Sequence, residues 1–337
     1  MTGQQIHWRE SVTAKTKSVR SMDDITNNPE YLNVRDLSNR DLLELFEGGD
    51  QWDPTSEIVR IFKAIAPSTD PDLLLRTHDT INQIFSGTFP GFKGGPTGYH
   101  DLRHTRSVVL AAARLLHGLT CQGIHLSPEM IQLGLISAYF HDTGMLLTNE
   151  DSEKTGAAYL KCHEERSIQF LQRYLKDNGF KQKHLSGCTV IIHCTNLMVD
   201  PRTLTFPSPE IRIAAEVVGS ADIMAQMADR YYLESLPLLF LEFHSAGIDR
   251  YQSSLELMKQ TARFYHDVIK QRLLVAFDNT IAAAQSHFRE WWHIDQNLYM
   301  EFIAKNVAYL ECALLTCNNE EECMTKFLRR KIPKIEP

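Results

Sequence analysis

Six histidine and aspartate positions draw attention because each lies in or beside an apolar run. A His-Asp pair follows LGLISAYF, a histidine follows CTVII, and an aspartate lies inside IAAEVVGSADIMA. Burying an imidazole or a carboxylate is costly unless the group is paired or bound to a metal. Imidazole nitrogen and carboxylate oxygen are also the ligands that borderline divalent cations accept. The sequence therefore predicts a metal centre that draws together His104, His141, Asp142, His163, His193 and Asp222.

Each of these residues also has a purely structural explanation. Taken singly, His104 or His193 fits an interior histidine held by hydrogen bonds, and Asp222 could pair with Arg212 or Arg230. The adjacent His-Asp pair is the most specific element, because neighbouring side chains at a helix end can reach the same ion. Six such residues in one chain favour a shared metal over separate explanations.

Several helices must position these residues. Apolar residues recur at spacings of three and four, and runs of strict alternation are missing, so the sequence predicts an all-α fold. A Gly- and Pro-rich run over 86–98 predicts a loop that leads directly into Tyr99-His100. Helices are expected over 56–85 with a break at PSTDPD, and over 102–119, 127–140, 163–178, 185–196, 209–228, 233–243, 254–287 and 298–315.

Three segments are expected along the chain. Residues 1–55 are polar and rich in turn signals, which predicts an N-terminal lead-in, and residues 56–325 are expected to form the helical catalytic domain. The segment 326–337 is basic and contains prolines, which predicts a solvated tail. The long helices within 254–315 are compatible with a homodimer surface, and their tryptophans, Trp291 and Trp292, are expected in the core.

The order His, His-Asp, His, His, Asp on successive helices resembles the HD-domain superfamily of metal-dependent phosphohydrolases, over roughly residues 95–245. The resemblance implies a phosphodiesterase-like helical bundle with extra C-terminal helices. It also implies two divalent ions of zinc, iron, manganese or magnesium. By this resemblance Asp142 bridges two sites, of which the first is completed by His104, His141 and Asp222, and the second by His163 and His193.

The segment Tyr99-His100-Asp101-x-x-His104 is similar to the YHNxxH segment of cyclic nucleotide phosphodiesterases, with Asp101 in place of the asparagine. By this resemblance His100 would protonate the leaving oxygen. His100 and His104 lie at positions i and i+4, so one imidazole can bind metal while the other points at substrate. The alternative for His100 is a surface histidine at the end of a loop.

The chain departs from these enzymes in three ways. The HDxxH continuation is replaced by the run His141–Met145, no purine-clamping glutamine can be assigned, and no GYP triplet is present. The missing triplet disfavours hydrolysis of cyclic dinucleotides. Base recognition is therefore left open by the sequence.

The expected activity is hydrolysis of a cyclic nucleotide or a related small phosphoester, with His100 and Asp142 as catalytic residues. Metal-activated water would attack phosphorus, and His100 would act as general acid. Two other classes fit the same ligands. One is a mixed-valent di-iron oxygenase of the HD fold, similar to myo-inositol oxygenase, and the other is a regulatory module that binds a nucleotide. His100 favours hydrolysis, since an oxygenase needs no acid at that position.

Composition argues against several other classes of function. Hydrophobic residues make up 43% and charged residues 23% of the 337 residues, as in an ordinary globular protein. The net charge of -7 provides no basic field for duplex nucleic acid or an anionic membrane. No apolar run is long enough to span a bilayer, and the start shows no apolar leader. Seven cysteines, an odd number in a chain without an export signal, predict reduced thiols in a cytoplasmic protein, and the substrate is expected to be a small molecule. No CxxC pair occurs, so a zinc site made of thiolates is not expected.

Overall fold

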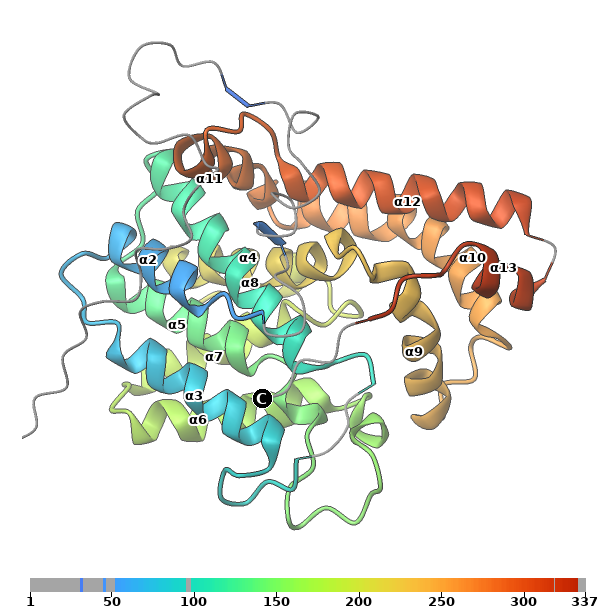
Figure 1. Cartoon of the computed structure of the whole chain (residues 1–337). Coiled ribbons are helices and arrows are strands. Elements are labelled where there is room, and N and C mark those ends of the chain that lie inside the picture. Colours follow the sequence, from blue (N-terminus) through green and yellow to red (C-terminus); the bar gives the residue numbers. More distant parts are fainter. Residues whose placement is uncertain (1–30, 33–44, 47–51, 95–97, 318, 333–337) are drawn as a thin grey trace, which may run out of the picture.

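The computed structural model describes residues 31–32, 45–46, 52–94, 98–317 and 319–332, and these residues form an all-α protein (Figure 1). The predicted fold class is therefore confirmed. Two long helices, α4 (Leu102–Cys121) and α8 (Pro209–Ala228), lie against each other at the centre. The other α-helices in the described part of the chain are α2 (Thr55–Ile65), α3 (Asp72–Ser86), α5 (Pro128–Phe140), α6 (His163–Asp177), α7 (Gln182–His193), α9 (Tyr232–Ser245), α10 (Ser254–Phe264), α11 (Ala283–Trp292), α12 (Leu298–Thr316) and α13 (Glu320–Lys326).

The two central helices begin at well-defined caps. The Asp101 side chain accepts a hydrogen bond from the backbone of His104 at the start of α4. Ser208 caps α8 in the same way, and a proline follows it at the first helical position. Such caps satisfy backbone N–H groups that have no partner within the helix. The caps therefore fix the start of both helices that dominate the core.

The surrounding helices cover the central pair on different sides. Helix α5 packs against both α4 and α8, and α7 packs against α5 and α8, while α6 lies on α7. On the other side, α11 packs against α4, and α12 packs against α8 (Figure 1). The side chains of α4 are buried along nearly its whole length, since it is enclosed from several directions. Burial of this apolar surface is the main force that holds the bundle together.

One predicted helix is wrong. The expected helix over 254–287 is broken: α10 ends at Phe264, two π-helical turns follow, and the chain then reverses before α11 begins. Asp278 and Asn279 at the reversal adopt left-handed backbone conformations, with φ of 48° and 55°. Asp and Asn tolerate this conformation better than most residues do, and it ends a helix. The remaining predicted helices agree with the structure to within a few residues at each end.

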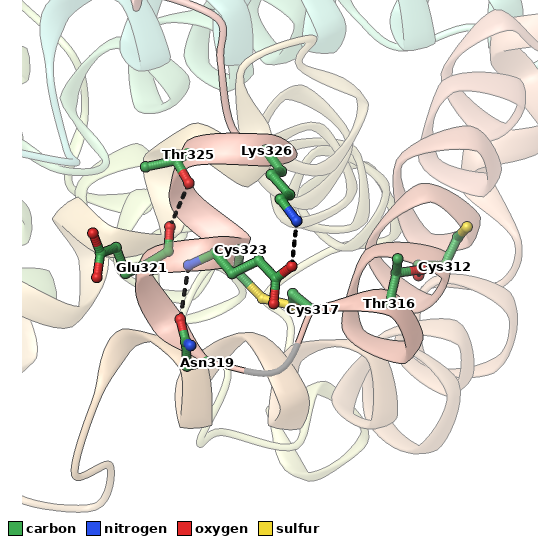
Figure 2. The surroundings of a disulfide bond; sticks show 9 residues. Cys312, Thr316, Cys317, Asn319, Glu321, Cys323, Thr325 and Lys326 are labelled. Atoms are coloured by element: carbon green, nitrogen blue, oxygen red, sulfur yellow. Dashed lines mark hydrogen bonds and ion pairs between the residues drawn. A yellow bond between two sulfur atoms is a disulfide. The ribbon is translucent and has the colours of Figure 1, made fainter.

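The C-terminal helices are joined by a disulfide. Cys317, just after α12, is bonded to Cys323 in α13, with 5.2 Å between their Cα atoms (Figure 2). This pairing corrects the expectation that all seven cysteines are free thiols. The spacing of the two cysteines did not reveal the pairing, because it is the chain reversal between α12 and α13 that brings them together. Five cysteines are free, namely Cys121, Cys162, Cys188, Cys194 and Cys312. The expected cytoplasmic location stays a prediction.

The segment after α13 runs back along the protein rather than into solvent. The Arg330 guanidinium donates to Arg230 O at 2.7 Å, and the Arg330 backbone N–H donates to Glu234 at 3.2 Å. The first part of the predicted solvated tail is thus attached to the region where α9 begins. Residues 333–337, and most of the predicted lead-in over 1–55, lie outside the described residues.

Two further expectations concern the surface and the core. Trp291 and Trp292 are partly buried and pack against the hydrophobic core, as predicted. No helix in the described part of the chain combines the length and apolarity needed to cross a membrane. The homodimer surface expected on the C-terminal helices stays a prediction.

Candidate metal centre

Four helices bring the candidate ligands together. His104 lies in the first turn of α4, His141-Asp142 follow the last turn of α5, His163 is the first residue of α6, and Asp222 lies within α8. Among the described residues, His104, His141 and Asp222 form a group whose ligand atoms all lie within 4.8 Å of one another. Side chains from distant parts of the sequence thus converge on one point.

The ligand atoms of this group have the spacing of a coordination sphere. His104 Nε2 lies 3.3 Å from His141 Nε2 and 3.1 Å from Asp222 Oδ1. His141 Nε2 lies 3.6 Å from the same Asp222 oxygen. Around an ion with bonds of about 2.0–2.2 Å, neighbouring ligand atoms of a tetrahedron stand about 3.3–3.6 Å apart. The three residues therefore fit a bound divalent cation.

Asp142 lies between this group and His163. Asp142 Oδ2 is 3.0 Å from His141 Nε2 and 3.4 Å from His104 Nε2, while Asp142 Oδ1 is 3.4 Å from His163 Nε2. The carboxylate is buried, yet its Oδ2 has no hydrogen-bond partner in the described structure. A buried carboxylate oxygen without a hydrogen bond is costly, and coordination to a cation supplies the missing interaction. Because its two oxygens face different histidines, Asp142 also has the placement of a bridging ligand.

Backbone carbonyls orient two of the histidines. His141 Nδ1 lies 2.8 Å from Ala138 O, and His163 Nδ1 lies 2.8 Å from Leu160 O. A carbonyl oxygen can only accept, so Nδ1 carries a proton, and Nε2, on the side of Asp142, is the nitrogen that can bind a cation. Metal-binding histidines are commonly oriented by such contacts. Both imidazoles are therefore arranged as ligands.

A glycine shapes the backbone just after the His-Asp pair. Gly144 lies in the 3₁₀ turn Thr143–Met145, and its N–H donates to Ser167 Oγ at 2.8 Å. A Cβ at this position would collide with the backbone oxygen of His163. The absence of a side chain lets the turn lie directly against the start of α6. This contact is what brings His163 close to Asp142.

The carboxylates of the centre favour protonated histidines before a cation binds. Burial lowers the pKa of His104, but the neighbouring carboxylates of Asp142 and Asp222 outweigh burial and raise the pKa to about 9. At His163, burial is likewise outweighed by Asp142, and the pKa rises to about 9. Burial raises the pKa of each carboxylate, but the neighbouring histidines outweigh it and lower both. A cation that binds here must displace protons.

A further histidine beside the centre is held by a buried glutamate. His100 Nδ1 lies 2.6 Å from Glu242 Oε2, and Glu242 Oε1 accepts from the Tyr99 backbone N–H at 2.6 Å. The centroid of the His100 ring lies 6.2 Å from that of His104 and 6.0 Å from that of His163. Because the carboxylate occupies Nδ1, Nε2 is the nitrogen left to exchange a proton with a bound molecule.

Glu242 was not among the residues predicted from the sequence. It lies in α9, far along the chain from the loop that carries His100, and its exposed fraction is only 6%. The available signal is a single acidic residue within the apolar run LPLLFLEF. A buried acid of this kind needs a partner, but the sequence does not show which residue supplies it.

Two other sequence-selected residues lie outside the cluster of ligands. His193 is the last residue of α7 and is half-buried, and no hydrogen bond or ion pair in the described regions joins it to the other predicted ligands. Its place in a second metal site stays a prediction. Asp101 caps α4, where its Oδ1 accepts from the His104 N–H at 2.8 Å. Asp101 thus contacts the backbone of His104 and fixes the helix turn that carries it; it does not contact the His104 ring in this hydrogen bond.

One comparison with known proteins gives a match. A family model described as Npun_R2479-like matches residues 93–301, which is more than half of the chain. The matched segment contains all six predicted metal ligands, together with His100 and Glu242. No curated protein and no solved structure matches the chain.

Proposed function

The chain belongs to the Npun_R2479-like family, and we propose that it is a metal-dependent phosphohydrolase of the HD type that hydrolyses a small phosphoester. The observation that carries this proposal is the position of His100. A histidine held by a buried carboxylate lies beside a cluster of metal-ligand side chains, with ring centroids about 6 Å apart. Hydrolysis of an unactivated ester needs both a site for the phosphoryl oxygens and a proton for the leaving oxygen.

Two neighbouring cation positions are proposed. The first is formed by His104, His141, Asp142 and Asp222, and the second lies where His163 meets the other oxygen of Asp142. Zinc, iron, manganese and magnesium are the candidate ions. A divalent ion bound here would supply Lewis acidity, which polarises a phosphoryl oxygen and makes water a better nucleophile at neutral pH.

The residues of the chain would then perform the remaining tasks. Hydrolysis forms a bond between phosphorus and a water oxygen and breaks the bond between phosphorus and the leaving oxygen. His100 is placed to donate its Nε2 proton to that leaving oxygen, since Nδ1 is engaged by Glu242. The carboxylate of Glu242 keeps the ring oriented. A general acid of this kind accelerates such a reaction by about 10²- to 10⁴-fold.

The test combines metal analysis with two classes of substrate. The purified protein is analysed for bound metals, depleted with a chelator and reloaded separately with each candidate ion. It is then assayed on cyclic mononucleotides and on p-nitrophenyl phosphoesters. We expect His100→Gln to retain its metal and to lose about 10²-fold or more in rate on the nucleotides, but much less on p-nitrophenyl esters, whose leaving group needs no proton.

Three outcomes would contradict the proposal or a part of it. A protein that hydrolyses no phosphoester with any of the ions would exclude it, and iron with substrate-dependent oxygen uptake would indicate the di-iron oxygenase class instead. A His100→Gln variant with undiminished rate on the natural ester would remove the general acid from the mechanism. The matched control is His244→Gln, because His244 is an exposed residue of α9 that lies outside the centre.

A further inference from the structure

A large cavity lies between the central helices and α12. It has a volume of about 480 Å³ and is bounded by side chains from α4, α8 and α12, with Arg330 contributed by the segment after α13. Cavities that bind small molecules typically have volumes of about 300–1,000 Å³. The space is therefore of the right size for a ligand, and the metal centre does not account for it.

The cavity adjoins a small recess that reaches His104. Arg103 and Asp229, which form an ion pair, line both the cavity and the recess. Asp222, a candidate ligand in α8, lies seven residues before Asp229, which follows the last residue of α8, or about 10 Å along the helix axis. The cavity is therefore a close neighbour of the metal centre, and the Arg103–Asp229 pair belongs to the walls of both spaces.

The rim of the cavity is positively charged. Arg230, Lys305 and Arg330 are exposed there. Two carboxylates lie nearby: Asp229, which pairs with Arg103, and Glu234, which accepts a hydrogen bond from the Arg330 backbone N–H. The Arg330 guanidinium is held at this place by its hydrogen bond to Arg230 O. Three such cations contrast with the net charge of -7 of the whole chain. The rim is thus a local site of attraction for an anion.

One side of the cavity is aromatic. Tyr299 and Phe302 are three residues apart in α12, so they share a helix face, and Trp52 lies with them along the same lining. The amide of Asn306, one turn further along α12, is fixed by hydrogen bonds to two carbonyls at the end of α8. The Lys305 ammonium lies 5.2 Å from the centroid of the Phe302 ring. Aromatic side chains stack on a planar ring, and the neighbouring cations suit an anionic group attached to that ring.

We propose that this cavity binds the organic part of the substrate, and that the substrate is nucleotide-like: a planar aromatic ring whose far end carries a second anionic group. The ring packs against the aromatic side, and the second anion contacts Lys305 and Arg330. This proposal rests on the proposed function in one respect: it places the phosphoester end of the same molecule at the metal centre.

The test measures binding to the full chain, as purified and again after removal of metals with a chelator. Adenosine 5′-monophosphate and adenosine are the probes, and isothermal titration supplies the dissociation constants. We expect the monophosphate to bind about tenfold more tightly than adenosine in both preparations, because its phosphate forms charge-assisted contacts at the rim. This advantage should shrink as salt is added.

Variants separate the rim from the aromatic side. Lys305→Gln combined with Arg330→Gln should abolish the advantage of the phosphate, and Phe302→Leu should weaken binding of both probes. Lys331→Gln is the matched control, since Lys331 is exposed next to Arg330 and does not line the cavity. Circular dichroism establishes that each variant is folded.

The binding experiment distinguishes a failure of the cavity proposal from a failure of the proposed function. Equal binding of the two probes, unchanged binding in the double variant, or no saturable binding at all would overturn the cavity proposal, even if phosphoesters were hydrolysed. Binding that depends on Lys305 and Arg330 in a protein that hydrolyses nothing would overturn the proposed function and leave the cavity proposal standing.

Discussion

At the scale of single residues, Asp142 connects the parts of the candidate centre. One of its oxygens faces His104 and His141, and the other faces His163. The carboxylate is buried, and the oxygen shared between two imidazoles makes no hydrogen bond in the described structure. A buried carboxylate in this position needs compensating positive charge, either from the protonated imidazoles around it or from a bound cation.

Replacement of Asp142 should remove the metal. Asp142→Asn keeps the size of the side chain but removes its negative charge, so we expect loss of at least about 100-fold in metal affinity, with hydrolysis lost as well. Metal content after gel filtration and titration of the depleted protein measure the change. Glu165→Gln, an exposed substitution on the neighbouring helix, is the control. Full metal content in Asp142→Asn would refute the assignment.

Metal affinity should depend on pH in a defined direction. His104 and His163 have raised pKa values of about 9, so both rings are protonated at neutral pH before a cation binds. A ligand ring must be neutral, and binding therefore releases protons. We expect the apparent affinity to rise from neutral pH and to level off above about 9. Titrations in buffers of different ionisation enthalpy count the released protons, and affinity that is constant over this range would contradict the expectation.

Glu242 should act through His100. Glu242→Gln replaces the carboxylate that accepts from His100 Nδ1 by an amide of the same shape, so we expect a less well oriented ring and about a 10- to 10²-fold lower kcat on esters with poor leaving groups. The loss should be small on p-nitrophenyl esters, whose leaving group needs no proton. Equal losses on both substrates would instead indicate that Glu242 supports the structure only.

At the scale of elements, the packing of α11 on α4 depends on a buried pair of histidines. His287 Nδ1 lies 3.2 Å from His117 Nδ1, and His287 also stacks on Trp291. Burial, with further contributions from Arg114 and His117, lowers the pKa of His287 well below its ordinary value of 6.5. This ring is therefore neutral in the folded protein at mildly acidic pH, where the unfolded chain binds a proton.

Acid should therefore destabilise the junction between α4 and α11. Because the folded-state pKa of His287 is lowered, the unfolded state binds more protons below pH 6.5, and the free energy of unfolding falls as pH decreases from there. The slope attributable to one proton is at most about 1.4 kcal/mol per pH unit. His287→Leu should flatten this dependence in urea unfolding measured across a pH series. The exposed His244→Gln serves as control, and identical slopes in wild type and His287→Leu would contradict the prediction.

At the scale of the whole molecule, the C-terminal helices are packed directly on the bundle that carries the candidate metal ligands. One close approach is at Gly118 in α4, where a Cβ would collide with the backbone oxygen of Ala283 at the start of α11. Glycine permits this contact because it has no side chain. The chain reversal at Asp278 and Asn279 is what brings α11 to this place.

Gly118→Ala should destabilise the whole protein. Moving the backbone of α11 to make room costs about 1–3 kcal/mol, which exceeds the helix-propensity gain of about 0.5–1 kcal/mol from alanine. Gly134→Ala is the matched control, because its Cβ would meet only the Ala214 side chain at an ordinary 3.7 Å. Thermal unfolding of both variants gives the comparison. A Gly118→Ala protein as stable as Gly134→Ala would show that the two layers are not rigidly packed.

The sequence by itself determined the all-α class, most helix boundaries and the residues suited to bind a cation. These follow from local rules: apolar spacing gives helices, and imidazole and carboxylate groups within apolar runs need a partner. The turn at Asp278 and Asn279 was missed because the flanking segments both have helical spacing and no proline or glycine separates them.

Only the tertiary structure decided which of those residues meet. It placed Asp142 between His104, His141 and His163, paired His100 with Glu242, and left His193 without a described contact to them. It also joined Cys317 to Cys323 and brought Arg330 to the rim of the cavity. The physical reason is that each of these contacts joins segments brought together by a chain reversal or by helix packing. The spacing of residues along one segment carries no information about which other segment will pack against it.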